Sequence, residues 1–503
     1  MSKRRLLGFP MKGLDARASQ GSSPETLSMA NNIRGADQDL LAFSNHNDYL
    51  TSPSSSSQTA RNLIQFFMSP PGGPDQNMLI MLTTSGAWRL VTPPSTWTLV
   101  EGAYGLVPIT LPGGGVTYPR YAWANSAHQL AWTCARAGVR VRLYDGTTVT
   151  AIAQDYAADH MIAINHRLMI GNTVESGIRN GARLRWCANR NFSDWTALSS
   201  GFLEVGSNYS SGSIKAAVNF DEIALVSLEN ELIQIIPTGS LFPAFEEGTH
   251  FLGVSVFAAN SWQTYNHVAY FLGPDTVYAW DSRHFVPIGR PVEKLLRPFL
   301  DPKRTFGIQG LIVPARAEYH LLVTEGTRAG NSAALIFIYD INADRWFLDT
   351  PTAVSCLGKI NTVYQDTAYV VGNATAPKEF TLRSDGFDRV GMEERTSHTE
   401  PGRADTQDFF AVDLQQQPSV NAKNNFQALF FQTTPNAQIT VGHSIDSGAN
   451  WTTQLVTANS EGYGTYSNNA SFNKIRFTFR AADTYLMLTG LLQMEYEDMG
   501  DTY

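Results

Sequence analysis

Short apolar runs separated by turn residues recur along most of the chain from about residue 61. The runs are rich in Val, Ile, Tyr and Phe, and most are too brief to form helices. Gly, Asn or Asp stands between paired runs, as the tight turn of a hairpin requires. Several runs also alternate apolar and polar positions, which is typical of a strand with one buried face. The pattern therefore predicts an all-β chain built from antiparallel strands.

The paired runs repeat at a spacing of roughly 40 residues, the size of a four-stranded propeller blade. Two stacked β-sandwiches would give a similar strand spacing, but the even repeat favours a β-propeller over residues 61–390. We expect about seven blades, and a count of six or eight fits the same spacing. The paired runs are 79–82 with 88–91, 129–132 with 139–146, 160–164 with 167–170 and 184–187, 223–227 with 232–236, 268–272 with 276–281, 318–323 with 334–340, and 367–371 with 378–382.

Residues 1–60 differ from the rest because they are polar, Ser-rich and without sustained alternation. A segment of this composition buries too little apolar surface to order itself. Spaced apolar residues favour an extended N-terminal arm that lies on another surface or subunit, and a disordered tail is the alternative. These apolar residues are Leu14, Leu27, Met29, Ile33, Leu40 and Leu41.

The last part of the chain predicts a second, smaller unit. Residues 391–407 are charged and polar, which is typical of a linker. Residues 408–503 contain further alternating runs, and their pattern predicts a C-terminal β-sandwich of jelly-roll or immunoglobulin-like type. The runs are 409–414, 427–431, 438–444, 474–480 and 491–497.

The formal charge of the chain is −8, and only 16% of its residues are charged. An acidic chain is not expected to grip nucleic acid through its phosphates, although it can let nucleic acid pass. The three cysteines are far apart and form no C-x-x-C pair, so no zinc ribbon or disulfide framework is expected. No apolar segment follows the basic start, and none approaches the ~18 residues of a membrane span. We therefore expect neither a signal peptide nor stable membrane insertion.

No catalytic or cofactor-binding motif is recognisable in the sequence. The phosphate-binding loop G-x-x-x-x-G-K-[ST], the dinucleotide fingerprint G-x-G-x-x-G and the nucleophile elbow G-x-S-x-G are all missing. His160 and His166 do not have the spacing of H-E-x-x-H, and no carboxylate or Cys completes a ligand set. We therefore expect no enzymatic activity, no catalytic residue, no cofactor and no metal.

One turn motif stands out in the C-terminal unit. Ser444, Asp446, Gly448 and Trp451 fit the Asp-box S-x-D-x-G-x-T-W, with Asn450 in place of Thr. In this motif the Asp side chain caps a tight hairpin by accepting bonds from turn amides, and the Gly adopts a positive φ. Its role is structural even in the sialidases in which it recurs. The arginine triad, tyrosine nucleophile and acid of a sialidase cannot be assembled from this sequence.

Three N-terminal segments carry a resemblance to a known family: Pro10–Gly13, Pro24–Glu25 and Met29–Ile33. Together with the Asp-box turn and the closing strands Ile475–Phe477 and Leu491–Tyr496, the chain resembles the hub or nozzle proteins of short-tailed bacteriophages. In that family an arm precedes a β-propeller and a β-sandwich closes the chain. The Ser-rich stretch near residue 54 and the long loop around residue 330 depart from the family pattern.

The resemblance implies a structural virion protein that forms a ring, as a homohexamer, at the distal end of a phage tail. Such a ring would be assembled in the host cytoplasm, dock a head-to-tail adaptor and tail fibres or spikes, retain the viral DNA and gate its ejection, without binding that DNA specifically. Flexible loops would then close the channel. The candidate channel loops contain Gly72, Gly73, Gly113, Gly114 and Gly115. The alternative function is a glycan-binding or sialidase-like propeller enzyme that acts on host surface carbohydrate.

Overall fold

The structure is a computed structural model of the 503-residue chain. It describes residues 2–501 with the exception of 8–26, 32, 38–39, 44, 51–59, 69–75, 92–96, 103, 112–115, 127–128, 207–211, 315–316, 329–330, 350–353, 361–367, 374–379, 385–402, 407–408, 411–421, 434–435, 447–448, 462, 473 and 482–486. The described residues fold mainly into antiparallel strands, so the prediction of an all-β chain is confirmed. The one α-helix among them is α1 (Glu293–Leu296).

Much of the chain forms small antiparallel sheets of four consecutive strands each, and the last such group, β28–β31, continues through β2 into a ten-stranded sheet. The alternation of short apolar runs and tight turns produces this order, because each strand pairs with the next through a hairpin. The sheets are β6 (Ala60–Met68), β7 (Gln76–Thr83), β8 (Gly86–Val91) and β9 (Thr98–Gly102); β12 (Ala122–Asn125), β13 (Leu130–Cys134), β14 (Val139–Tyr144) and β15 (Val149–Ala151); β16 (Tyr156–Ile164), β17 (Arg167–Glu175), β18 (Ile178–Trp186) and β19 (Gly201–Glu204); β20 (Ala216–Phe220), β21 (Ile223–Ser227), β22 (Glu231–Pro237) and β23 (Phe245–Leu252); β24 (Gln263–Tyr265), β25 (Val268–Leu272), β26 (Val277–Trp280) and β27 (Phe285–Val286); and β28 (Gln309–Val313), β29 (Glu318–Arg328), β30 (Asn331–Asp340) and β31 (Arg345–Asp349).

A further four-stranded sheet combines the two ends of this region. It contains β32 (Val354–Ile360), β33 (Ala368–Asn373) and β34 (Phe380–Ser384), and its fourth strand is β5 (Asn45–Leu50) from the start of the chain. β5 pairs antiparallel with β34. A strand from near the N-terminus therefore completes the sheet that lies last in the chain.

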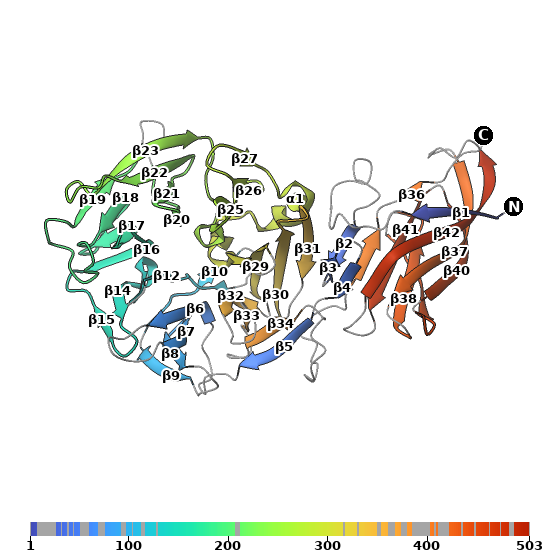
Figure 1. Ribbon diagram of the computed structural model, residues 1–503, viewed down its shortest axis with the longest axis horizontal. Coiled ribbons are helices and arrows are strands. Elements are labelled where there is room, and N and C mark those ends of the chain that lie inside the picture. The colour runs from blue at the N-terminus through green and yellow to red at the C-terminus, as the bar shows by residue number, and fades with distance from the viewer. Residues whose placement is uncertain are drawn as a thin grey trace.

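The sheets are arranged in a closed ring (Figure 1). Their first strands contact one another in chain order, from β12 through β16, β20, β24, β28 and β32, and β32 in turn contacts β6. The side-chain amide of Asn62 in β6 closes the circuit, because it exchanges hydrogen bonds with the backbone N–H and carbonyl of Tyr121 beside β12. Closure of this kind hides the edges of the inner strands, which would otherwise accept foreign strands.

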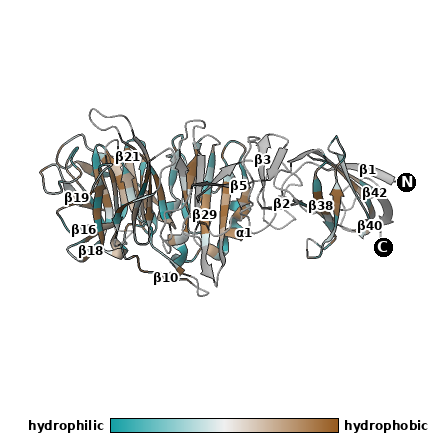
Figure 2. Ribbon diagram, turned by 90° about the horizontal axis from the view of Figure 1, so that it is seen from below, coloured by the Kyte–Doolittle hydropathy of each residue, from teal (hydrophilic) through white to brown (hydrophobic). Residues whose placement is uncertain are grey.

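Aromatic side chains fill the spaces between neighbouring sheets. Trp280 of β26 packs against Phe220 and Phe251 of the preceding sheet, with ring centroids 5.0 and 5.3 Å apart. Trp186 packs against Phe245 of the next sheet at 5.1 Å. Figure 2 shows the corresponding hydrophobic colouring along the strands of the ring. This burial between sheets is the main source of the ring's stability.

A second body lies beside the ring and contains two sheets (Figure 1). Phe426 of one sheet packs on Phe477 of the other, and Phe431 packs on Phe479, at 5.4 and 5.7 Å. The two sheets therefore share a buried apolar interior. The first contains β1 (Ser2–Leu7), β3 (Ile33–Asp37), β4 (Leu40–Phe43), β37 (Ala422–Thr433), β40 (Tyr463–Phe472) and β42 (Met487–Asp501), and the second contains β2 (Leu27–Asn31), β35 (Arg403–Thr406), β36 (Phe409–Phe410), β38 (Gln438–Ser444), β39 (Thr452–Thr457) and β41 (Lys474–Ala481).

The N-terminal strands join the two bodies. β2 pairs with β31 of the ring through Asn31 and Leu348, and with β35 of the second body. β1 and β4 pair with β42, and β5 pairs within the ring. Strands of residues 1–60 thus pair within their own chain, whereas the sequence favoured an arm lying on another surface or subunit. The physical reason is that β31, β34, β35 and β42 offer edges that these strands can complete.

Polar side chains connect neighbouring sheets at their inner strands. The Gln309 amide donates to the carbonyl of Leu357 at 3.0 Å and accepts from its N–H at 2.9 Å. The Tyr319 hydroxyl donates to the carbonyl of Ser261 at 2.8 Å. Each of these bonds fixes one sheet against the next, so the sheets cannot slide freely past one another.

Gly310 in β28 lies against the backbone of Ser261, which precedes β24, and its substitution gives a direct test of the packing. A Cβ at this position would lie 2.2 Å from the carbonyl oxygen of Ser261 and 3.0 Å from the Tyr319 ring. We therefore expect Gly310→Val to lower the free energy of unfolding by about 3 kcal/mol, as overpacking does. Denaturant unfolding followed by tryptophan fluorescence measures this loss. Gly105→Val is the control, because nothing lies within 4 Å of its Cβ position.

Candidate functional site

The glycines predicted as channel loops all lie outside the described residues, as does Gly448 of the Asp-box. The strands that flank residues 112–115 are described. They form a short antiparallel hairpin of β10 (Ile109–Thr110) and β11 (Val116–Thr117) in the connection between β9 and β12.

The hairpin reaches across the ring. β11 contacts β29 and the 3₁₀ segment η6 (Pro302–Gly307), which precedes β28. The β6–β9 sheet and the β32–β34 sheet separate these partners along the circumference. Arg136, in the β12–β15 sheet, likewise places its guanidinium 4.4 Å from the centroid of the Phe306 ring in η6. Two connecting segments from non-adjacent sheets thus meet inside the ring.

Two buried arginines hold this crossing together. Arg61, at the start of β6, donates to the carbonyls of Tyr118, Pro119 and Phe306. The bond to Phe306 is 2.9 Å long and joins residues 245 positions apart in the sequence.

Arg120 completes the arrangement from the opposite side. Its guanidinium donates to the carbonyl of Arg61, and to that of Ser355 in β32 at 2.9 Å. The two side chains together connect the β6–β9 sheet, the segment between β11 and β12, η6 and the β32–β34 sheet. We call Arg61 and Arg120 the arginine lock.

The electrostatics of the lock are unusual because two positive charges are buried side by side. Burial lowers the pKa of Arg61 to about 10, and neighbouring thiol and phenol groups oppose this shift. Burial also lowers the pKa of Arg120 well below its ordinary value, and the charge of Arg61 lowers it further. Within the described part of the chain no ion pair joins either guanidinium to a carboxylate. The backbone carbonyls that accept hydrogen bonds from the two guanidiniums therefore offset part of the cost of burying these charges.

The lock is not recognisable in the amino-acid sequence. Arg61 and Arg120 each stand at the edge of a strand run, where an arginine is usually exposed to solvent. No local pattern shows that the chain brings them together with segments 245 residues away. The only sequence signal was the position of both arginines beside buried strands, and that signal is shared by many surface arginines.

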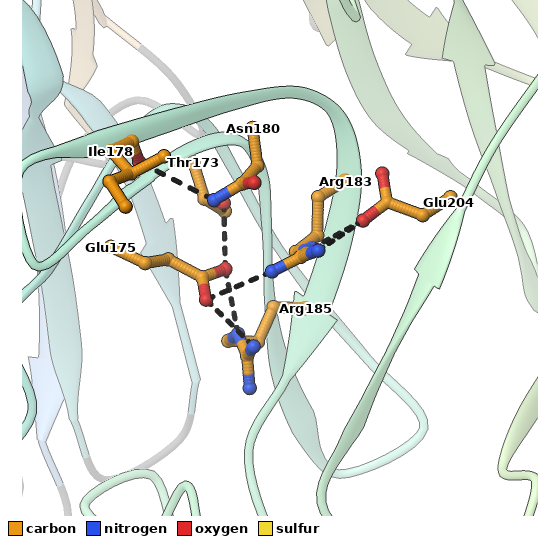
Figure 3. A network of polar contacts seen from close by, with 7 residues as sticks. All are labelled: Thr173, Glu175, Ile178, Asn180, Arg183, Arg185 and Glu204. Atoms are coloured by element: carbon orange, nitrogen blue, oxygen red, sulfur yellow. Dashed lines mark hydrogen bonds and ion pairs between the residues drawn. The ribbon is translucent and has the colours of Figure 1, made fainter.

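A second polar cluster lies on the β16–β19 sheet (Figure 3). Glu175 accepts two hydrogen bonds from Arg185, at 2.9 and 2.8 Å, and one each from Arg183 and Thr173, at 3.2 and 2.8 Å. Arg183 also pairs with Glu204. Burial acts to raise the pKa of Glu175, but the bonds from Arg185 and Thr173 and the charges of both arginines outweigh it and lower that pKa. Glu175 therefore stays ionised near neutral pH.

Aromatic rings cover the arginines of this cluster. The Arg183 guanidinium lies 4.4 Å from the centroid of the Phe202 ring, and the Arg185 guanidinium lies 4.8 Å from that of Tyr156. Phe202 nevertheless keeps 51% of its surface exposed. The cluster thus offers solvent an apolar ring beside two guanidiniums whose positions are fixed by Glu175.

The Asp-box turn lies between β38 and β39. Asp446 accepts hydrogen bonds from the Ser444 hydroxyl at 2.5 Å, the Asn450 N–H at 2.9 Å and the Asn450 side-chain amide at 2.6 Å. Asn450, which replaces the Thr of the motif, therefore supplies two of the donors. Trp451 is partly buried and immediately precedes β39. These bonds fix the turn through which the chain enters β39.

The Asp446 carboxylate should make the second body sensitive to acid. The bond from Ser444, followed by those from Asn450, lowers the pKa of Asp446 from 3.8 to about 2. A lowered pKa stabilises the fold above the unfolded value, and this contribution disappears as the pH falls through the folded value. We expect Asp446→Asn to lower the melting temperature at pH 6, with a difference from wild type that shrinks between pH 4 and pH 2.

Differential scanning calorimetry at several pH values measures this difference. The control is Glu461→Gln, which changes an exposed carboxylate outside the turn. A difference between wild type and Asp446→Asn that stays constant down to pH 2 would show that the carboxylate does not cap the turn.

The described residues contain no group of three or more His, Cys, Asp and Glu side chains that could hold a metal ion. Among the same residues, no helix combines the length and apolar character of a membrane span. The three cysteines are free and buried.

No family model matches the chain, and no curated protein matches it either. Among solved structures, the chain is similar to an exo-β-1,3-galactanase from Phanerochaete chrysosporium at 8% identity and a TM-score of 0.27, over 78% of this chain and 99% of that chain. It is also similar to a sialidase from Trypanosoma rangeli at 8% identity and a TM-score of 0.31, over 90% of this chain and 95% of that chain. At these values neither similarity assigns a substrate or a catalytic residue.

Both of these solved structures are enzymes, which contradicts the expectation that this chain has no enzymatic activity. The expectation of no enzymatic activity therefore does not stand, and there is a physical reason why missing motifs are a weak basis for it. Catalytic groups are recognised by their geometry and roles, and they can come from separate strands without any contiguous motif. The lack of a short motif therefore does not exclude chemistry.

Proposed function

We propose that this chain is a hub or nozzle subunit of a short-tailed bacteriophage tail. In this role, copies of the chain form a ring at the distal end of the tail, retain the viral DNA and gate its ejection, while they dock the head-to-tail adaptor and the fibres or spikes. The proposal combines the resemblance of the N-terminal segments Pro10–Gly13 and Met29–Ile33 with the architecture of the ring.

The proposed fold is a propeller of about seven blades followed by a β-sandwich. The blades are the four-stranded sheets that succeed one another around the ring, with β5 completing the last of them. The sandwich consists of the two sheets whose apolar faces meet through Phe426 and Phe477. β2 connects the two parts by pairing with a strand of each.

The observation that carries the proposal is the crossing held by the arginine lock. A propeller that works as an isolated binding unit commonly uses the open end of its axis, whereas here β11 and η6 lie across the ring and are fixed by Arg61 and Arg120. We infer that DNA does not pass through the ring of one copy. A passage for DNA has to form between copies, which makes the ring a rigid wall element of a larger assembly.

The negative charge of the chain is compatible with a surface that lines a passage for DNA. With a formal charge of −8, an assembly of copies repels the phosphate backbone, so DNA can move along it without specific binding. When the tail contacts the host, the passage for DNA can then open only if loops or whole copies are displaced. Blades fixed by side-chain hydrogen bonds cannot hinge far.

The proposal is tested with virions assembled in cells that do not produce this chain. We expect such particles to lose their DNA or to package it in a nuclease-sensitive form, and supply of the chain in trans should restore nuclease resistance. Virions that lack the chain, keep nuclease-resistant DNA and infect normally would contradict the proposal.

A second candidate function is a glycan-binding or sialidase-like enzyme, and the Phe202 cluster is the observation that favours it. An exposed aromatic ring beside fixed guanidiniums can stack on a sugar and attract its carboxylate.

On this alternative, Phe202→Ala is expected to weaken binding of sialyllactose about tenfold, or about 1.4 kcal/mol. Isothermal titration calorimetry measures the affinity. The control is Leu198→Ala, because Leu198 is 93% exposed and lies in the connection between β18 and β19 of the same sheet. The absence of measurable binding by the wild type would contradict this alternative.

A further inference from the structure

Two edge strands lie on the same side of the second body. Among the described strands, β39 is the last of its sheet and pairs with β38 alone, and β40 is the last of the other sheet and pairs with β37 alone. The two strands contact each other, and the Tyr466 hydroxyl of β40 donates to the carbonyl of Thr452 in β39 at 3.0 Å. We call the side formed by β39 and β40 the double edge.

The double edge carries almost no charge. Between Ala449 and Phe472 the only charged residue is Glu461, which lies in the connection between the two strands. β39 has the sequence TTQLVT, and all its residues except Val456 are exposed. Leu455 and Tyr463 each expose 53% of their surface. A long, uncharged and β-prone edge of this kind readily accepts another strand.

Among the described residues, the other outer strands carry charge, are covered by another strand or are very short, as in β15 and β27 with three and two residues. The outer strand β23 carries Glu246, Glu247 and His250, and β19 carries Glu204. The outer strand β31 is covered by β2. Natural proteins use charge or coverage in this way to prevent unwanted edge-to-edge pairing. The double edge has neither form of protection among the described residues.

We infer that the double edge is the surface through which one copy of this chain contacts a second copy. The inference rests on the proposed function, which requires copies to assemble, and it identifies the surface that they use. The net charge of the chain is the reason to assign a second copy to this surface. Each copy has a formal charge of −8, so two copies carry a net repulsion, and the uncharged double edge is a place where they can approach without adding like charges to the contact.

The Asp-box turn favours strand pairing at the double edge. Asp446 fixes the turn that leads into β39, since it accepts bonds from Ser444 and Asn450. A strand edge held in one conformation before pairing loses less conformational entropy when a partner strand adds to it. The motif that the sequence singled out thus prepares the edge for its partner.

The first experiment measures the assembly state of the full chain by mass photometry and sedimentation velocity. The variant combines Leu455→Lys with Tyr463→Lys, which places charge on the double edge at exposed positions. The control combines Leu252→Lys with Val286→Lys, which changes two residues that are 58% and 50% exposed on the ring. Melting temperatures within a few degrees of wild type establish that both variants are folded.

The expected result is that wild type and control assemble to the same extent, while the double-edge variant remains monomeric or requires at least tenfold more protein to assemble. A double-edge variant that assembles like wild type would overturn the inference and leave the proposed function standing. A wild type that is monomeric at all concentrations would overturn both.

The second experiment identifies the contact directly. A photoreactive phenylalanine analogue replaces Tyr463, and unlabelled and isotope-labelled copies are mixed before irradiation. Cross-linked peptides that combine both labels are expected, and the same analogue at Leu252 should give none. Cross-links confined to single copies, or formed only with a different protein, would overturn the assignment of a second copy to this surface.

Discussion

Deletion of residues 1–50 is expected to open the ring and to separate the two bodies. The deletion removes β5, which is the fourth strand of the β32–β34 sheet, and β2, which pairs with both β31 and β35. Loss of these pairings exposes the edges of β34, β31 and β35 to solvent and to foreign strands. The lost pairing is comparable with the whole stability of a domain, roughly 5–15 kcal/mol, so we expect the truncated chain to aggregate or to unfold in more than one step.

Hydrogen exchange followed by mass spectrometry measures this effect locally. Protection should fall most in β32–β34 and β31 and least in β16–β19, on the far side of the ring. Deletion of residues 1–7 is the control, because it removes only β1, which pairs with β42 in the second body. Unchanged exchange in β34 after deletion of residues 1–50 would show that β5 does not close the ring.

Arg61→Ala is expected to lower the free energy of unfolding by about 3 kcal/mol. The substitution removes the donor from the buried carbonyls of Tyr118, Pro119 and Phe306, and an unsatisfied buried acceptor costs about 1–3 kcal/mol. Relief of the burial that lowers the pKa of Arg61 offsets part of this loss. Denaturant unfolding measures the net change.

The control for this substitution is Arg140→Ala. Arg140 pairs with Asp155 at 2.6 Å, but both side chains are 48% exposed, so its loss is expected to cost below about 1 kcal/mol. Trypsin provides a second measurement, because release of Phe306 should speed cleavage after Lys303 and Arg304 in η6. Equal stability of the two variants, with unchanged trypsin cleavage, would show that Arg61 does not hold η6 across the ring.

The strand content of the chain could be predicted because it depends on local patterns. The paired runs 268–272 and 276–281 correspond to β25 and β26, and the runs 223–227 and 232–236 correspond to β21 and β22. Hairpins of this kind are encoded by short apolar runs and the turn residues between them. The Asp-box turn was predictable for the same reason, since all its bonds lie within residues 444–450.

The pairing of distant segments could not be predicted from local patterns. β5 contains Asn45, His46, Asn47 and Asp48, which suggest a loop, yet it pairs with β34 because that strand offers an open edge. The arginine lock depends on contacts between residues 61, 120, 306 and 355, and no spacing rule relates these positions. Contacts of this range are set by the closed ring as a whole, which no single segment specifies.

Electron microscopy of the purified full-length chain tests the central claim most directly, because it shows both the ring of sheets in one copy and the arrangement of copies. The account predicts closed rings of several copies, in which the only continuous passage lies between copies and the centre of each propeller is filled. Isolated single copies at all protein concentrations, or copies whose own axis is open from one face to the other, would contradict it.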